Sequence, residues 1–294
     1  MRRKLLLALA FVLTFGIATF AGTNVISALE RTTYTAVYPV QAGGLNRTYE
    51  MIAPIAAQPD SAPIIVVLSG ISAPVQNEIK RDLLTPYVNS GQAELVYPVA
   101  YRESWNAGGD CCGMAATHQV NDLAFMQALV PAVDPGHKHP IYVVGYSNGG
   151  RLAYDVACAS PGLFDGYAII KAMPDPGCDL THPVTILQID SLNDYAVPYK
   201  PGEKGPESPP ATVQNVRLRD LDGCTGAGGA VRLGEITDTT WTDCTSGQRV
   251  DFAVWDTGGH NFPNWGQPVS KATPDAAQII VSFFTKTPVA PVPS

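Results

Sequence analysis

The sequence has few charged side chains and no excess of basic ones. Only 15% of its 294 residues are Asp, Glu, Lys or Arg, and the formal net charge is −7. Proteins that bind nucleic acid or an anionic membrane present a basic face to that partner. The composition therefore argues against both partners, and it gives no positive information about a substrate.

The chain also lacks an internal repeat and an appended binding module. It does have an export pattern, because three of its first four residues are basic and the stretch 5–21 carries no charge. This stretch is nearly long enough to span a bilayer, so an uncleaved anchor stays open beside a cleaved signal. We expect a signal peptide or N-terminal anchor over 1–28, cleaved after Ala21 or Ala28 if it is removed. A secreted or cell-envelope protein follows, with membrane contact only if the segment is uncleaved.

None of the six cysteines stands in a Cys-x-x-Cys pair, the spacing typical of a zinc site. Export favours disulfides and disfavours a free catalytic thiol, because exported thiols tend to be oxidised. Six cysteines permit fifteen pairings, and the sequence does not decide among them. A bridge between the two adjacent cysteines is a hypothesis; the six are Cys111, Cys112, Cys158, Cys178, Cys224 and Cys244.

Short apolar runs alternate with helical patterns along the rest of the chain. After a hairpin-like opening over 34–53, strands are expected over 64–68, 94–99, 141–144, 167–170, 184–189 and 252–255. Helices are expected over 77–84, 120–129, 151–159, 213–221 and 275–285. This alternation predicts an α/β fold with a mostly parallel central sheet and helices on both faces. We expect one catalytic domain over 29–287 and a flexible tail over 288–294.

The most informative segment is Gly145-Tyr146-Ser147-Asn148-Gly149, which joins an apolar strand to a helical pattern. This pattern is typical of a tight turn that exposes a nucleophilic serine. The two glycines let the strand and the helix approach without a clash at Cβ. The dipole of the following helix points at the oxyanion that develops during attack. We therefore predict Ser147 as the nucleophile.

A serine hydroxyl needs a base to take its proton, and with this turn the acid and the histidine follow the serine in the chain. Only His182 and His260 follow Ser147. His182 stands before a strand, whereas His260 comes after one, at the end of the sheet where α/β proteins bind ligands. The sequence therefore predicts His260 as the base.

The acid is expected in the loop after strand 184–189, where the sequence reads Asp190-Ser191-Leu192-Asn193-Asp194. Asp194 lies farther into the loop and is the predicted partner of His260, with Asp190 as the alternative. The oxyanion hole of such a site uses the backbone N–H after the nucleophile and one from an earlier strand-end loop. These donors are expected at Asn148 and Ile71.

Four segments form a set: Trp105–Gly113, Gly145–Gly150, Asp194–Tyr199 with its Val-Pro-Tyr ending, and Gly258–Pro263. Together with the Cys224 and Cys244 pair, they resemble motifs of the secreted polyhydroxybutyrate-depolymerase-like and feruloyl-esterase-like α/β hydrolases. The resemblance covers about residues 49–284. It implies an α/β-hydrolase fold and hydrolysis of carboxylic esters without a metal or organic cofactor.

The chain departs from this group at two positions. Ser69 stands where the group usually has a histidine, and Phe262 stands where a tryptophan often follows the catalytic histidine. Both positions adjoin the predicted site, so the substrate contacts are expected to differ. The residues expected to contact substrate are Trp105, Tyr146 and Phe262, although a purely structural role for the Trp105 loop is equally open.

The predicted function is a secreted serine esterase that acts on short-chain acyl, hydroxyalkanoate or aryl esters, feruloyl esters included. The partner is then a small-molecule or oligomeric ester, and the sequence does not indicate an oligomeric state. Two enzymatic alternatives use the same residues: acyl transfer to a cell-envelope alcohol and, less favoured, peptide hydrolysis. An alternative of another class is a catalytically silent α/β-hydrolase domain that serves as an envelope binding protein.

Overall fold

The computed structural model describes residues 33–109, 111–263, 273–287 and 289. The predicted export segment over 1–28 lies outside these ranges, and so does all of the predicted tail except residue 289. Within them, no helix combines the length and the apolar character that crossing a membrane requires.

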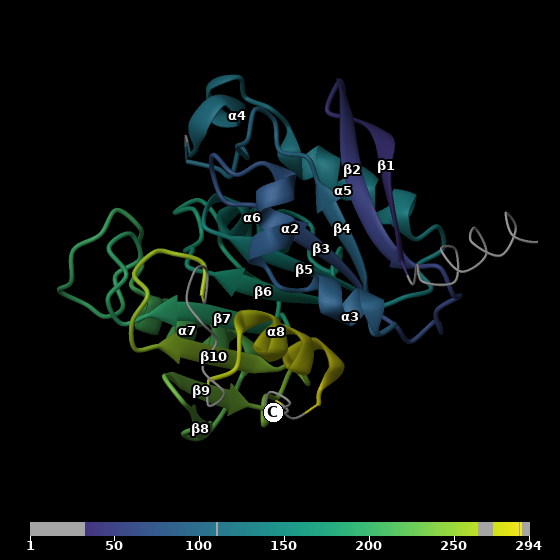
Figure 1. Cartoon of the computed structure of the whole chain (residues 1–294). Helices are drawn as coiled ribbons and strands as arrows, with labels where there is room; N and C mark the ends of the chain where they lie inside the picture. The colour runs from purple at the N-terminus through teal and green to yellow at the C-terminus, as the bar shows by residue number, and fades with distance from the viewer. Residues whose placement is uncertain (1–32, 110, 264–272, 288, 290–294) are drawn as a thin grey trace, which may run out of the picture.

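A ten-stranded sheet organises the described chain (Figure 1). Its order is β1-β2-β4-β3-β5-β6-β7-β10-β9-β8. The six strands from β4 to β10 pair in parallel, and antiparallel pairs close both edges. The bounds are β1 Thr33–Ala42, β2 Leu45–Pro54, β3 Ile64–Leu68, β4 Glu94–Pro98, β5 Ile141–Tyr146, β6 Gly166–Ile170, β7 Ile186–Ser191, β8 Gly229–Leu233, β9 Ile236–Trp241 and β10 Val250–Trp255.

Helices cover both faces of this sheet (Figure 1). They are α2 Val75–Arg81, α3 Thr85–Asn89, α4 Gly113–Thr117, α5 Asp122–Val133, α6 Asn148–Ala159, α7 Ala211–Asp222 and α8 Ala276–Thr285. One core cluster joins the sheet to α5, α6 and α7, and the other joins it to α3 and α8. Strand β3 contributes to both, with Ile64, Val66 and Leu68 on one face and Ile65 and Val67 on the other. Burial on both faces explains its uninterrupted apolar run.

Parallel pairing brings the loops after the central strands to one edge. Leu68 on β3 pairs with Gly145 on β5, so the loop after β3 begins beside the predicted nucleophile. Ser191 on β7 pairs with Trp255 on β10, so the loops that carry Asp194 and His260 leave the sheet side by side.

The predicted α/β class and mostly parallel sheet are confirmed, but the elements differ in detail. The short helices α3 and α4 were not predicted, and several helix and strand ends lie a few residues from the predicted ones. The antiparallel hairpin β8–β9 was not predicted. Strand β8 reads Gly-Ala-Val-Arg-Leu and is mostly exposed, and β9 reads Ile-Thr-Asp-Thr-Thr-Trp and is buried only at its two ends, so neither alternates between apolar and polar residues. Strand β7 runs two residues beyond the predicted end at residue 189. Asp190 therefore lies inside a buried strand rather than in a loop, which bears on the choice of the acid.

Candidate active site

The turn between β5 and α6 holds Ser147 in a strained backbone conformation, with φ 52° and ψ −116°. Its amide donates a hydrogen bond of 2.9 Å to the carbonyl of Ile170 at the end of β6. Positive φ is unfavourable for a residue with a Cβ and persists where the surrounding structure imposes it. The result is a half-buried serine at the carboxyl edge of the sheet.

Glycine is required on both sides of this serine because the backbones are too close for a side chain. A Cβ on Gly145 would lie 2.5 Å from the carbonyl oxygen of Gly149. A Cβ on Gly149 would lie 2.4 Å from the carbonyl oxygen of Leu68 on β3. These distances match the steric reason for glycine that the sequence pattern suggested.

The structure brings Ser147, His260 and Asp194 together. Oγ of Ser147 lies 2.9 Å from Nε2 of His260, and Nδ1 of His260 lies 3.0 Å from each carboxylate oxygen of Asp194. This geometry lets the imidazole take a proton from the serine hydroxyl while the carboxylate fixes its orientation. Chemically, the arrangement can generate an alkoxide nucleophile at neutral pH.

The environment of Asp194 favours its ionised form. Burial alone would raise the pKa of this carboxyl, but hydrogen bonds and charge outweigh it. His260 contributes most, and the amides of Val197 and Ala196 donate to Oδ1 at 3.0 and 2.7 Å. The pKa of Asp194 is consequently lower than its ordinary value, so the carboxylate is ready to stabilise an imidazolium.

Asp190, the alternative acid, occupies a different environment. Its side chain is fully buried on β7, where Oδ2 accepts a 2.7 Å hydrogen bond from Nε2 of Gln188. Burial raises the pKa of Asp190 to about 7. Since Nδ1 of His260 contacts the carboxylate of Asp194, the structure favours Asp194 over Asp190 for orienting the imidazole.

The two loops expected to form the oxyanion hole meet beside Ser147. A Cβ built on Gly70 would lie 3.6 Å from Cβ of Ser147, so the loop after β3 touches the nucleophile. Asn148 is the first residue of α6, where backbone N–H groups have no partner inside the helix. The two predicted donors, Asn148 and Ile71, are thus on adjoining segments.

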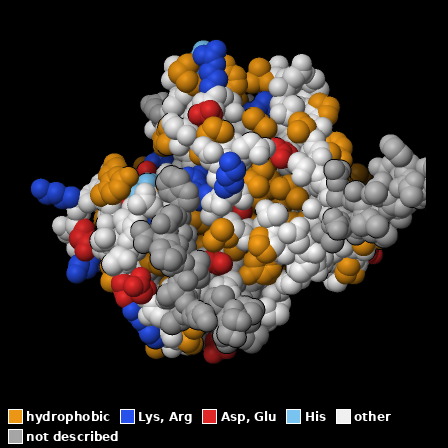
Figure 2. Space-filling model, in the orientation of Figure 1, with side chains coloured by type: hydrophobic (Ala, Val, Ile, Leu, Met, Phe, Trp, Pro, Cys, Tyr) orange, Lys and Arg blue, Asp and Glu red, His pale blue; other side chains and the backbone are white. Residues whose placement is uncertain are grey.

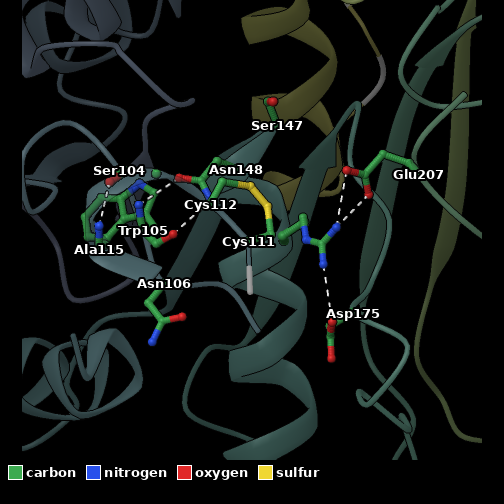
Figure 3. Close-up of a disulfide and its surroundings, with 12 residues drawn as sticks. Ser104, Trp105, Asn106, Cys111, Cys112, Ala115, Ser147, Asn148, Asp175 and Glu207 are labelled. Carbon is green, nitrogen blue, oxygen red and sulfur yellow. Dashed lines mark hydrogen bonds and ion pairs between the residues drawn. A yellow bond between two sulfur atoms is a disulfide. The ribbon is translucent and has the colours of Figure 1, made fainter. Parts of the chain in front are cut away.

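Trp105 joins these two loops and does not face an open site, because its side chain is fully buried. Its amide donates to Oδ1 of Asn148 at 2.7 Å, and its carbonyl accepts from Nδ2 of Asn148 at 3.0 Å (Figure 3). Its indole Nε1 donates to the carbonyl of Ser69 at 2.9 Å. Of the two roles left open for this loop, the burial of Trp105 favours the structural one.

Phe262 and Tyr146, also expected to contact substrate, have internal contacts. Phe262 is buried and packs edge-on against Tyr146, with ring centroids 5.4 Å apart. The Tyr146 hydroxyl donates to the carbonyl of His260 at 2.5 Å, and the guanidinium of Arg81 lies 4.7 Å from the Tyr146 ring centroid. Phe262 therefore supports Tyr146 rather than offering a surface to substrate. Half-buried Tyr146 supports the histidine loop.

A residue outside the predicted set lies directly beside the histidine. Tyr195 is 72% exposed, and its ring centroid lies 5.6 Å from that of His260. Ile71, Leu192 and Met114 are also exposed apolar side chains, from the loops after β3 and β7 and from α4. Figure 2 shows hydrophobic side chains interspersed with polar ones on one face of the molecule. Tyr195 is part of the Asp194–Tyr199 motif, so its position next to the predicted acid was the sequence feature that could have indicated it.

All six cysteines form disulfides in the described chain: Cys111–Cys112, Cys158–Cys178 and Cys224–Cys244. The adjacent-cysteine bridge, a hypothesis from the sequence, is therefore present. Figure 3 shows it close to Asn148, at the end of the loop that begins with Ser104 and Trp105. The amide of Cys112 donates to the carbonyl of Trp105 at 3.2 Å. This disulfide thus belongs to the segment that packs against the nucleophile turn.

Comparison with known proteins supports the fold and the class of reaction. No protein-family model matches the chain. A Nocardia uniformis subsp. tsuyamanensis protein with the provisional name esterase NocK is 25% identical over 269 residues, which cover 81% of this chain and 77% of that protein. Feruloyl esterase C of Emericella nidulans is 26% identical over 219 residues, covering 68% of this chain and 70% of that enzyme.

A solved structure of a Klebsiella pneumoniae protein, provisionally named a dienelactone hydrolase, has the same fold. It superposes with a TM-score of 0.53 at 15% identity over 87% of this chain and 100% of that one. None of these three relatives is named as a polyhydroxybutyrate depolymerase, so that part of the resemblance rests on sequence motifs alone. The chain is an α/β hydrolase that is similar to feruloyl esterases, and its class is that of the carboxylic ester hydrolases.

Proposed function

We propose that the chain is an exported serine esterase that hydrolyses carboxylic esters through an acyl-enzyme on Ser147. His260 acts as general base and then as general acid, and Asp194 orients it. The single observation that carries the proposal is the hydrogen-bonded chain from Oγ of Ser147 through His260 to Asp194. The lowered pKa of Asp194 supports the same roles, because the mechanism needs an ionised carboxylate there.

The reaction proceeds in two acyl-transfer steps. Nε2 of His260 takes the proton of Ser147 as Oγ attacks the ester carbonyl, and Asp194 stabilises the resulting imidazolium. The backbone amides of Asn148 and Ile71 stabilise the oxyanion by roughly 3 kcal/mol per donor. His260 then protonates the departing alcohol. A water molecule, activated by the same imidazole, attacks the acyl-enzyme and releases the acid.

The proposed substrates are short-chain acyl, hydroxyalkanoate or aryl esters, feruloyl esters included. The exposed ring of Tyr195 beside His260 supports an aryl or other apolar group, since aromatic rings stack favourably and bury a large apolar area. Similarity to a protein named feruloyl esterase C points in the same direction. Export is supported by the three disulfides, which persist in oxidising compartments.

Release of p-nitrophenol from acetate, butyrate and octanoate esters tests the proposal, with methyl ferulate as an aryl substrate. The wild-type protein should turn over the short esters and react with a fluorophosphonate probe at Ser147. Ser147→Ala should do neither while keeping its circular dichroism spectrum. Activity that persists in Ser147→Ala would exclude this nucleophile, and a wild type inert to both substrate and probe would favour a catalytically silent domain.

A further inference from the structure

We propose that Lys171 is a positioning residue that holds the His260 loop in reach of Ser147 through its buried ammonium group. Lys171 follows β6 and touches neither Ser147 nor Asp194 through a hydrogen bond given by the structure. The inference rests on the proposed function, because it concerns the residue that holds the loop of the proposed base, His260.

The contacts of Lys171 surround His260 on both sides. The side chain is buried, and its Nζ donates to the carbonyl of Gly259 at 2.5 Å and to the carbonyl of Asn261 at 2.7 Å. The carbonyl between them, that of His260, accepts from the hydroxyl of Tyr146 at 2.5 Å. Three successive carbonyls of the loop are therefore held by two side chains, and Lys171 holds two of the three.

This loop has little regular structure of its own to fix the imidazole. Residues 256–263 form neither helix nor strand. The segment is also held at its start by the Arg232–Asp256 ion pair and by a 3.0 Å bond from the Asp256 amide to the carbonyl of Glu235. Nearer to His260, the amide of Gly259 donates to Oδ1 of Asn193 at 2.9 Å, and the amide of Asn261 donates to the carbonyl of Gly258. Charge-assisted hydrogen bonds are stronger than neutral ones, so the ammonium gives the two residues that flank His260 a stronger hold than a neutral donor would.

The backbone at Lys171 indicates that this side chain is needed there. Lys171 has φ 51°, which is unfavourable for any residue other than glycine. Its amide donates to the carbonyl of Ile189 at 2.8 Å, so the neighbouring strand imposes the conformation. Strain of this kind is retained at functional sites where another requirement outweighs it. Here the requirement is an ammonium group directed into the histidine loop.

The charged groups near Lys171 come from β7 and from the loops that follow β7 and β10. Asp190 on β7 and Asp194 in the loop after it favour the ammonium form, while His260, in the segment that Lys171 binds, would oppose it once protonated. Burial outweighs the two carboxylates and lowers the pKa of Lys171 to about 8. The hold on the loop should therefore weaken at mildly alkaline pH, where the amine becomes neutral.

Substitution of Lys171 by Met and by Gln separates positioning from packing. Methionine keeps the volume without a donor, and glutamine keeps an uncharged N–H donor group on a shorter side chain. Lys138→Met, at an exposed site before β5 at the opposite end of the sheet, is the matched control. For Lys171→Met we expect kcat to fall by about 10- to 100-fold with KM nearly unchanged, because displacement of a base by about 1 Å costs on that order. The kcat of Lys171→Gln should lie between that of Lys171→Met and that of the wild type.

The pH profile supplies a readout that a purely structural role would not move. Wild-type kcat should decline above about pH 8, as expected for a lysine of lowered pKa. The same decline should be absent in Lys171→Met. A variant with wild-type kcat, or with low kcat and an unchanged alkaline decline, would overturn the proposal. If Lys171→Met does not fold, hydrogen exchange of residues 256–263 in the wild type tests the role. After correction for intrinsic exchange rates, protection of this loop should fall selectively between about pH 7 and 9.5. Unchanged protection would reject the role.

Failure of this inference is distinguishable from failure of the proposed function. The wild type and Ser147→Ala first establish whether Ser147 forms an acyl-enzyme. If Ser147 is shown to be the nucleophile, the Lys171 variants can be interpreted as effects on the base. Fluorophosphonate labelling of Ser147 should then slow in parallel with kcat. Labelling at the wild-type rate in a slow Lys171 variant would leave the esterase proposal intact and remove Lys171 from it.

Discussion

His260 and Asp194 form a bifurcated contact, in which Nδ1 of the imidazole lies 3.0 Å from both carboxylate oxygens. One of these oxygens, Oδ1, also accepts the amides of Ala196 and Val197. The carboxylate is therefore fixed by its own loop before it meets the imidazole. Such a fixed acceptor selects the tautomer in which Nε2 is free to take the Ser147 proton.

Substitution of the two aspartates by asparagine should separate their roles. Asp194→Asn should lower kcat on p-nitrophenyl butyrate by about 10⁴-fold, because an amide can favour the wrong imidazole tautomer. Asp190→Asn should change kcat by less than about tenfold, since Asp190 bonds to Gln188 and the structure gives it no bond to His260. Equal losses in the two variants, measured as steady-state kcat, would contradict the assignment.

Ser147→Gly should be more stable than Ser147→Ala. Both lose the hydroxyl, but only glycine adopts φ 52° and ψ −116° without strain. A strained non-glycine conformation costs on the order of 1–3 kcal/mol, partly offset by the greater flexibility of glycine in the unfolded chain. Urea unfolding of the two inactive variants measures the difference. A glycine variant less stable than alanine would show that the turn carries no such strain.

Asn148→Ala should destabilise the protein although it keeps the backbone amide proposed for the oxyanion hole. The substitution leaves the buried amide of Trp105 without its partner, whereas the Trp105 carbonyl keeps the hydrogen bond from the amide of Cys112. An unsatisfied buried group costs about 1–3 kcal/mol. We expect a loss of about 1–3 kcal/mol in the free energy of unfolding and a reduced kcat, because the loop on Ser69 shifts as well. Trp105→Phe, which removes the indole bond to Ser69 and leaves a cavity where part of the buried ring lay, should lose about 2–4 kcal/mol. An Asn148→Ala protein of wild-type stability would contradict this account.

The disulfides should differ in their contribution to stability. Cys158–Cys178 and Cys224–Cys244 each join residues separated by 20 positions. Loop-closure entropy predicts about 3 kcal/mol for a loop of that size. Cys111–Cys112 joins neighbours and restricts almost no loop in the unfolded chain. Double alanine variants, compared by denaturant unfolding, should show this contrast, and a larger loss at Cys111–Cys112 would reverse it.

Asp190 should make stability fall as pH rises through the acidic range. Burial raises the pKa of Asp190 from 3.8 to about 7. Between these values the folded chain keeps a proton that the unfolded chain has released, so the free energy of unfolding decreases as pH rises. Asp190→Asn has no proton to release, and its stability relative to the wild type should therefore increase over this interval. A difference that stays constant from about pH 4 to 7 would contradict the shift.

The sequence was sufficient for the class of fold and for the residues that follow the central strands. Ser147, Asp194 and His260 each come after a buried apolar run, and parallel pairing brings such positions to one edge without further information. The hairpin β8–β9 could not be predicted, because neither its mostly exposed first strand nor its half-buried second strand alternates between buried and exposed positions.

The supporting residues were beyond sequence analysis for a different reason. Trp105 was expected to contact substrate, yet its burial depends on segments 36 and 43 positions away along the chain. Lys171 is one lysine after a strand, and its role emerges only when the loop from β10 folds over it. The burial of Trp105 and the role of Lys171 both depend on contacts between distant segments, which a local sequence pattern does not reveal.

The end of the sheet opposite the candidate active site also carries exposed polar residues, and these can be used to orient the molecule. His137, Lys138 and Asp165 lie there, before β5 and β6, and all six cysteines of the chain are already oxidised to disulfides. A cysteine introduced at Lys138 would be the sole free thiol. Coupled to a support through it, the protein would stand with Ser147 turned toward the bulk solution, an arrangement suited to immobilised use on large or insoluble esters.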